Sequence, residues 1–149
     1  SALKARVVWH WLSDNDMLSG VDGVFADDTG LEISALGGAP GVRTARWAGD
    51  DAWDINNRRK ALKELLGVED RRARFRTVVS LILNGQLQQV EGIVNGCIAL
   101  AEEGDGGFGY DPIFIPEGYD RTFASLDTHE KNAISHRGRA MEELKKIVQ

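Results

Sequence analysis

An Asn-Gly dipeptide between two alternating runs of residues is the feature that most constrains the fold of this chain. Mainly apolar side chains occupy every second position from Phe75 to Leu83, and a second alternating run extends from Val90 to Leu100. Asn84 and Gly85, which stand between the two runs, tolerate the positive φ angles of a two-residue turn whose twist matches that of paired strands. The sequence therefore predicts a long antiparallel hairpin.

Helical and extended patterns surround this hairpin. Apolar spacing predicts helices over residues 3–12 and 51–66, a third that begins at a capping box formed by Asp127 and Glu130, and a fourth that begins near Ser135. Shorter apolar runs predict strands over residues 24–26 and 31–36, separated by an acidic turn at Asp27 and Asp28, and over residues 112–115. This mixture favours an α/β or α+β class with a mixed sheet.

Length and charge narrow the functional classes. The 149 residues are enough for one globular domain, residues 1–149, and too few for two. Lysine and arginine number 18 against 23 acidic residues, and the net charge of −5 argues against a bulk nucleic-acid binder. The single cysteine, Cys97, excludes an intramolecular disulfide, and no apolar run is long enough to span a membrane. We therefore expect a cytoplasmic protein.

Two adjacent carboxylates follow the first apolar run. Asp27 and Asp28 at a strand end would suit a Mg²⁺ or water-activating site, because hard cations prefer oxygen ligands. The alternative is that both side chains accept hydrogen bonds from turn amides, with Gly30 providing the bend. The triplet from Asp28 to Gly30 also resembles an aspartic-protease loop, which a dimer would have to supply twice; no flap sequence accompanies it, so we give this reading little weight.

Two further segments carry candidate binding residues. Gly104, Gly106 and Gly109 match the spacing of a dinucleotide fingerprint, but no helix is predicted after them, which leaves a flexible turn or a loop that approaches a flat ligand beside Phe108. Near the start of the last helix, a lysine, a histidine and an arginine could bind phosphate or carbonyl oxygens, or could form a solvated face. No zinc-ligand spacing is present.

Five sequence blocks together closely resemble the inosine triphosphate pyrophosphatase family. They are FADDTGLE (residues 25–32), ALGGAPGV (35–42), AR (45–46), FGYDPIF (108–114) and ISHRG (134–138). The resemblance implies an α/β fold with a mixed, elongated twisted sheet and flanking helices, in two lobes around a central cleft. It also implies Mg²⁺-dependent hydrolysis of ITP, dITP and XTP to the monophosphate and pyrophosphate, in a homodimer.

The same resemblance assigns roles to individual residues. Asp28 matches the catalytic acid that binds Mg²⁺ and activates water, and we take Asp27 as a second candidate metal ligand. Thr29 stands where a serine or threonine contacts substrate. The other matches form the nucleobase loop, the substrate lysine and the pair that reads the base: Phe108, Gly109, Tyr110 and Asp111; Lys131; and His136 with Arg137.

The chain also departs from the family pattern. The N-terminal strand, the phosphate loop with its Ser/Thr-x-Asn-x-x-Lys motif and an upstream metal-binding glutamate find no match in these 149 residues. We therefore expect an N-terminally truncated domain whose triphosphate grip is weakened, and a tight dimer, with exchange of elements as one form, that covers exposed apolar surface. The alternative is a catalytically inactive remnant that binds purine nucleotides or only self-associates.

Overall fold

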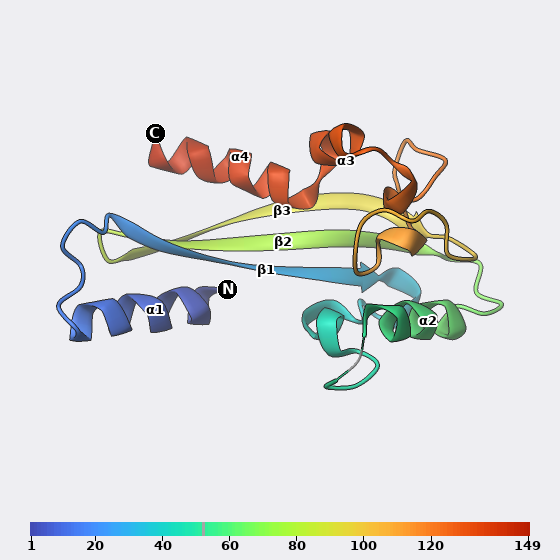
Figure 1. Ribbon diagram of the computed structural model, residues 1–149, viewed down its shortest axis with the longest axis horizontal. Coiled ribbons are helices and arrows are strands. Elements are labelled where there is room, and N and C mark those ends of the chain that lie inside the picture. Colours follow the sequence, from blue (N-terminus) through green and yellow to red (C-terminus); the bar gives the residue numbers. More distant parts are fainter. Residues whose placement is uncertain (52) are drawn as a thin grey trace.

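A four-stranded sheet forms the centre of the computed structural model, which describes residues 1–51 and 53–149 (Figure 1). Its strands are β1 (Gly23–Ile33), β2 (Arg72–Leu83), β3 (Gln86–Ile98) and β4 (Phe114–Pro116). They lie in the order β1-β2-β3-β4, and each of the three pairings is antiparallel. Figure 1 shows the first three strands as a long twisted ribbon, so the expected elongated sheet is confirmed.

The predicted hairpin is confirmed. Strands β2 and β3 are joined by Asn84 and Gly85, whose φ angles are 51° and 77°, and Leu83 pairs directly with Gln86. These positive angles are those of a two-residue turn that continues the strand twist. The hairpin contacts the first and the last of the four helices described next.

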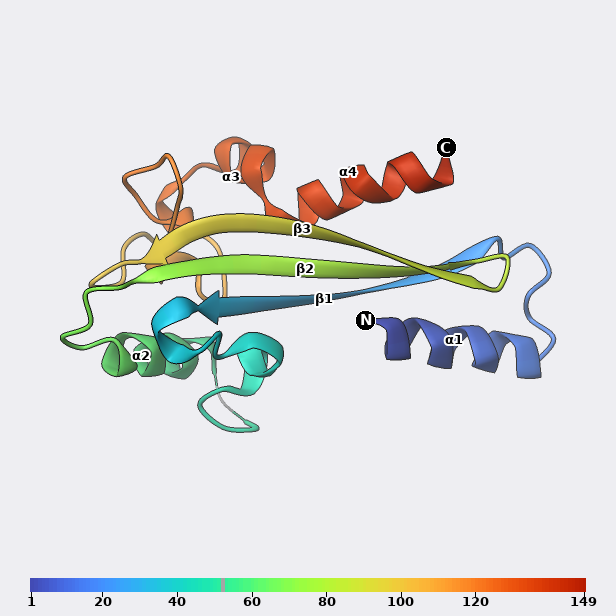
Figure 2. The same cartoon turned by 180° about the vertical axis from the view of Figure 1, so that it is seen from behind.

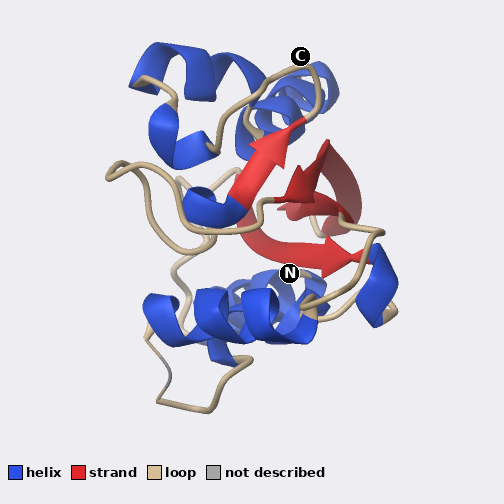
Figure 3. Ribbon diagram, turned by 90° about the vertical axis from the view of Figure 1, so that its right-hand side faces the viewer, coloured by secondary structure: helices blue, strands red, loops and turns tan. Residues whose placement is uncertain are grey.

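Helices cover both faces of the sheet. The four are α1 (Ala2–Asp14), α2 (Asp54–Glu64), α3 (Thr128–Ile134) and α4 (His136–Val148). In the end-on view of Figure 3 the sheet lies between two groups of helices. We call the side that contacts the start of α1, and carries Asp28 and Ser80, the α1 face; the side that carries Thr77 and Gly92 is the α4 face.

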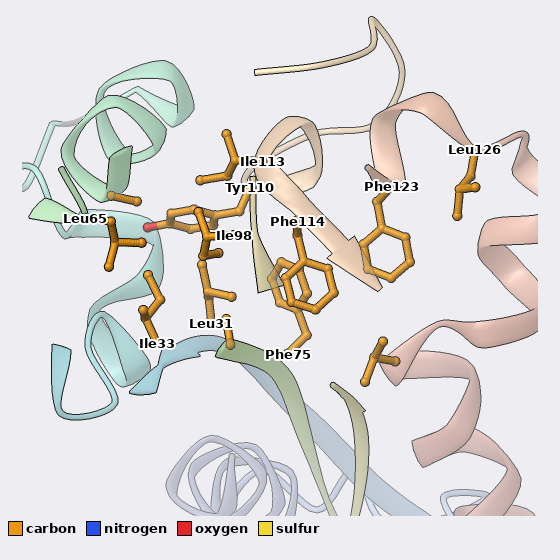
Figure 4. Packing of buried hydrophobic residues seen from close by; sticks show 13 residues of the cluster. Leu31, Ile33, Leu65, Phe75, Ile98, Tyr110, Ile113, Phe114, Phe123 and Leu126 are labelled. Carbon is orange, nitrogen blue, oxygen red and sulfur yellow. The ribbon is translucent and has the colours of Figure 1, made fainter. Parts of the chain in front are cut away.

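The main core lies at the end of the sheet away from the hairpin turn. Figure 4 shows Phe75 and Phe114 in contact there, with ring centroids 4.7 Å apart, among aliphatic side chains such as Leu31 and Ile98. A smaller cluster near the hairpin joins Val79 and Leu81 of β2 to the buried residues of α4. The main core thus joins β1 to β2, whereas the smaller cluster packs the hairpin against α4.

The predicted strand-turn-strand around Asp27 and Asp28 is wrong. Strand β1 runs without interruption, and the two acids pair with Val79 and Val78 of β2. Because β2 extends alongside, Asp28 joins the ladder of hydrogen bonds, while the Asp27 backbone faces the outer edge, where its carbonyl accepts from the Lys4 ammonium at 3.2 Å. The two charges are compensated by cationic side chains on opposite faces of the sheet.

The helices differ from their predicted patterns in burial more than in position. Helix α1 covers the predicted segment, but its apolar stripe is exposed: Leu3 is 76% and Trp11 55% accessible, and only Ala5 is buried. The predicted cap of α2, Asp51, is not its N-cap, because the helix begins at Asp54 after Trp53. Ala52, a predicted member of its inner stripe, lies outside the described residues.

The C-terminal helices agree with the sequence. Asp127 and Glu130 form the predicted capping box of α3, and the Ser135 hydroxyl accepts the Gly138 amide at the start of α4. Strand β4 starts at Phe114, after a 3₁₀ turn that takes up the first part of the predicted strand. None of the described helices is long and apolar enough to cross a membrane.

Candidate active site

Asp28 lies on the α1 face of β1, beside the start of α1. Its carboxylate accepts a hydrogen bond from the Lys4 ammonium. Figure 2 shows the N-terminal end of α1 next to the middle of β1. Partial burial opposes ionisation, but the pKa of Asp28 is lowered, with the hydrogen bond from Lys4 as the largest lowering contribution. Asp28 is therefore a stable anion held by a cation.

Asp27 points to the opposite face. Successive side chains of a strand alternate between faces, and the Asp27 carboxylate lies 3.4 Å from a guanidinium nitrogen of Arg137 at the start of α4. The two acids are thus separated by the sheet and do not converge as ligands of one ion. Among the described residues no group of three or more His, Cys, Asp or Glu side chains is placed to hold a metal.

The outer edge of β1 carries amides that face away from β2. The Leu31 and Ile33 amides donate outward, to the Thr44 hydroxyl at 2.9 Å and to the Ala39 carbonyl at 3.0 Å. By the alternation of an antiparallel ladder, the amides of Asp27 and Thr29 face the same edge. No described residue outside the β1–β2 ladder accepts from these two amides. This edge thus offers backbone donors to a ligand that passes over it.

A hollow of about 480 Å³ adjoins this edge on the α1 face, lined by Asp28, Thr29 and Arg76 together with glycines of the loop after β1. A smaller hollow of about 270 Å³ lies on the α4 face, where Asp27, Thr77 and Arg137 line it. A larger hollow, of about 620 Å³, lies beside Arg72 and Tyr119 and contains none of the predicted site residues. The two hollows that contain predicted site residues are therefore the candidates for substrate binding.

A chain of hydrogen bonds connects β1 to α4 along the α4 face of the sheet. Thr29 Oγ1 lies 2.8 Å from Thr77 Oγ1, which lies 2.6 Å from His136 Nδ1. The imidazole stacks on Phe75 with centroids 5.1 Å apart. Burial, with Arg137 as the next contribution, lowers the pKa of His136 to about 4. The ring is therefore neutral near pH 7, and its two nitrogens differ: one donates and the other accepts.

The glycine-rich loop is fixed by a buried acid. Asp111 Oδ2 accepts the Phe108 amide at 3.0 Å and the Lys131 ammonium at 2.5 Å. The ammonium also lies 4.9 Å from the centroid of the Phe108 ring, and this ring is 69% exposed. Gly107 adopts a φ of +74°, and a Cβ there would lie 2.3 Å from the Asp111 carboxylate. The loop thus presents an aromatic surface with a cation beneath it.

The remaining loop residues have structural contacts. The Gly109 amide donates to Asp54 at 3.0 Å, and its carbonyl accepts from Arg58 at 2.9 Å. The Tyr110 hydroxyl donates to the Thr44 carbonyl at 2.7 Å, and burial raises the pKa of Tyr110. Tyr110 and Asp111 are buried, so these two side chains shape the loop and leave its surface to Phe108.

The structure brings most of the predicted residues to one strip that crosses β1. Thr29, His136 and the Asp111–Lys131 pair lie on the α4 side, close enough for both charges to act on the imidazole, while Asp28 lies on the α1 side. Sequence reasoning missed Lys4 and Thr77. The signal for Thr77 was a hydroxyl in the inward-facing, otherwise apolar set of β2; Lys4 stands in a helix whose orientation no pattern revealed.

Comparison with known proteins supplies relatives for this arrangement. The Ham1 family model matches residues 1–147. A dITP/XTP pyrophosphatase of Christiangramia forsetii is 51% identical over 120 residues, which cover 80% of this chain and 63% of the relative. A dITP/XTP pyrophosphatase of Chlorobaculum tepidum is 51% identical over 129 residues, which cover 78% of this chain and 57% of the relative. The chain spans about three fifths of the length of these curated relatives.

Solved structures agree with the sequence relatives. The Staphylococcus aureus Ham1 protein superposes with a TM-score of 0.82 at 38% identity, covering 93% of this chain and 73% of that one. A nucleoside-triphosphatase, or dITP/XTP pyrophosphatase, of Mycobacterium abscessus gives a TM-score of 0.78 at 38% identity and covers 99% and 73%. The four-stranded sheet and its helices are thus a fold that these proteins share.

Proposed function

The chain belongs to the Ham1 family, and on this premise we propose that it hydrolyses the non-standard purine nucleoside triphosphates ITP, dITP and XTP to the monophosphate and pyrophosphate. The relatives named dITP/XTP pyrophosphatases support the reaction class. One observation carries the proposal: two consecutive residues of β1 present complementary groups on its two faces. On one face the Asp28 carboxylate accepts from Lys4. On the other face the Thr29 hydroxyl is connected through hydrogen bonds to His136. A nucleotide that crosses the free edge of β1 meets both.

The purine would lie on the α4 side. The exposed Phe108 ring offers a stacking surface, which accepts any base. Lys131, His136 and Arg137 supply donors that suit the 6-oxo group of hypoxanthine or xanthine. An adenine amino group there would leave these donors without an acceptor, which is how a site built on hydrogen bonds rejects an isosteric ligand.

The phosphates would lie over the edge and the α1 face, in the cleft between the two lobes that the family resemblance implies. The Thr29 amide and the Lys4 ammonium are the donors available to phosphate oxygens there. Water forms a bond to the α-phosphorus and releases a proton, while the bond from this phosphorus to the oxygen that bridges the α- and β-phosphates breaks. Pyrophosphate is the leaving group. Because the pKa of Asp28 is lowered, this carboxylate serves better as a fixed anion and ligand than as a strong base.

A divalent cation fits this face in one way. Mg²⁺ commonly takes one or two carboxylates and completes its shell with water and substrate phosphates. Asp28 meets that requirement with the phosphates of the nucleotide, whereas Asp27 faces the other side of the sheet and pairs with Arg137. When bound, Mg²⁺ would acidify the attacking water and offset the charge that develops on the phosphate oxygens.

We also propose a homodimer. The exposed apolar stripe of α1, including Leu3, Val7 and Trp11, supports burial of this helix against further protein. Size-exclusion chromatography with light scattering tests the assembly; a stable monomer would refute it. Location in the cytoplasm stays a prediction from the single cysteine.

The decisive test is pyrophosphate release from ITP, XTP and ATP with Mg²⁺, comparing wild type with Asp28→Ala and Asp27→Ala. We expect release from ITP and XTP that depends on Mg²⁺ and on Asp28, with Asp27→Ala much less impaired than Asp28→Ala. A folded protein that releases no pyrophosphate but binds IMP would favour the nucleotide-binding remnant. Full turnover by Asp28→Ala would refute the assignment of the acid.

A further inference from the structure

Thr77 is a buried hydroxyl that the proposed chemistry does not use. Its side chain is 0% exposed, it lies directly opposite Thr29 in the β1–β2 register, and its Oγ1 contacts only two polar atoms of the described residues. These are Thr29 Oγ1 at 2.8 Å and His136 Nδ1 at 2.6 Å. Because water does not reach Thr77, its single proton goes to one of these two partners.

The two partners define two opposite directions for the chain of hydrogen bonds. In the first, Thr29 donates to Thr77 and Thr77 donates to Nδ1, so the imidazole proton lies on Nε2. In the second, Nδ1 donates to Thr77 and Thr77 donates to Thr29, so Nε2 is an acceptor. Each direction leaves one proton without an acceptor among the described residues: the Nε2 proton in the first, and the proton of the half-buried Thr29 hydroxyl in the second. Only the first direction therefore offers a donor on the ring to a ligand.

The surroundings of the ring determine its protonation state. His136 stacks on Phe75 and adjoins the cations of Arg137 and Lys131, with Asp111 and Asp27 as the nearby acids. Burial of the ring lowers the pKa of His136 to about 4, which leaves one proton to be shared between the two nitrogens at neutral pH. The protein can therefore set the hydrogen-bonding character of Nε2 only through its contact at Nδ1.

We propose that Thr77 is a positioning residue that fixes His136 as the tautomer with its proton on Nε2, so that this histidine is an obligate donor toward an exocyclic oxygen of the purine. The proposal rests on the proposed function for its ligand, a 6-oxopurine nucleotide. A donor at Nε2 matches the 6-oxo group and opposes the 6-amino group of adenine. Thr77 then determines specificity without touching the substrate.

The first test reads the tautomer directly. Long-range ¹H–¹⁵N correlation spectra distinguish protonated from unprotonated ring nitrogens, and His136→Gln identifies the signals of this residue among the three histidines. We expect a single Nε2–H tautomer in wild type and in Thr77→Ser, and a mixture in Thr77→Val. Thr122→Val is the matched control, because Thr122 is also fully buried and donates to the Glu103 carbonyl at 2.7 Å, in another part of the fold. This control should keep the wild-type tautomer.

The second test reads selectivity as the ratio of kcat/KM for ITP to that for ATP. We expect Thr77→Val to lower this ratio about tenfold, the worth of roughly one hydrogen bond, and Thr77→Ser to restore it. An Nδ1–H tautomer in wild type, or an unchanged tautomer and ratio in Thr77→Val, overturns the proposal. If wild type releases no pyrophosphate from ITP, the proposed function fails, and the spectra together with IMP and AMP affinities still decide the role of Thr77.

Discussion

Replacement of His136 by glutamine should change how the stability of the fold depends on pH. In the folded chain burial, aided by Arg137, lowers the pKa of His136 from its ordinary 6.5 to about 4. Between these two values the unfolded chain binds a proton that the folded chain does not, so wild-type stability falls as the pH falls through this window. From about one pH unit above 6.5 the ring is neutral in both states and contributes no slope.

The size of the effect follows from the shift. Each unit of pKa difference corresponds to about 1.4 kcal/mol, so a fall from 6.5 to about 4 costs wild type about 3 kcal/mol by the time the pH reaches the folded value. Glutamine removes the titration but keeps a polar side chain at this position. The difference in unfolding free energy between wild type and His136→Gln isolates this term, because all other titrating groups are common to both.

Urea unfolding followed by circular dichroism at several pH values between 7.5 and 4 measures that difference. We expect wild type to lose about 3 kcal/mol relative to His136→Gln across the window, with most of the loss between pH 6 and 4.5. A difference that stays constant with pH would refute the reasoning, because it would mean that the imidazole titrates equally in the folded and unfolded chains. A difference of the opposite sign would mean that the folded state favours the imidazolium.

Two further substitutions test the supports of the site. Gly92→Ala would place a Cβ 2.0 Å from the His136 carbonyl oxygen, so α4 must shift; we expect a loss of about 1–3 kcal/mol in urea unfolding, and a loss below 0.5 would show that β3 and α4 separate freely. Asp111→Asn removes the charge that holds Lys131 and the Phe108 amide; we expect a loss of about 1.5–3 kcal/mol and faster proteolysis of the glycine-rich loop, and unchanged cleavage would contradict this anchoring.

The parts of the fold with strong local signals could be predicted from the sequence. The Asn84–Gly85 turn and the capping box of Asp127 are satisfied by contacts within a few residues, so their residue types are sufficient to place them. Strand β1 was misread because two acids in a row resemble a turn when the partner strand is not considered. The neighbour that makes the strand continuous, β2, lies about fifty residues further along the chain.

The residues of the candidate site also divide into those that local sequence could predict and those that it could not. The loop around Phe108 and the residues at the start of α4 were recognised from their sequence blocks, and the structure places them close together. The separation of Asp27 from Asp28 could not be seen until the segment was known to be a strand, because alternation decides which side each acid faces. Lys4 and Thr77 depend on contacts more than twenty residues apart in the chain, which no local pattern encodes.

The close approach of the Gly41 carbonyl to Gly30, and not the charge of the two acids, makes β1 intolerant of a shift in register. A slip of one residue against β2 would exchange Asp27 and Asp28 between the faces, and the cations of both faces would still find a carboxylate, so charge alone does not oppose the error. Gly30 opposes the shift, because a Cβ at its position would lie 2.7 Å from the Gly41 carbonyl oxygen. A shift in register would place Thr29 or Leu31 there, and both residues have a Cβ. The absence of a Cβ at Gly30 thus keeps each of the two consecutive aspartates on its own face of the sheet. An insertion or deletion in this strand should therefore disrupt the site even where composition is preserved.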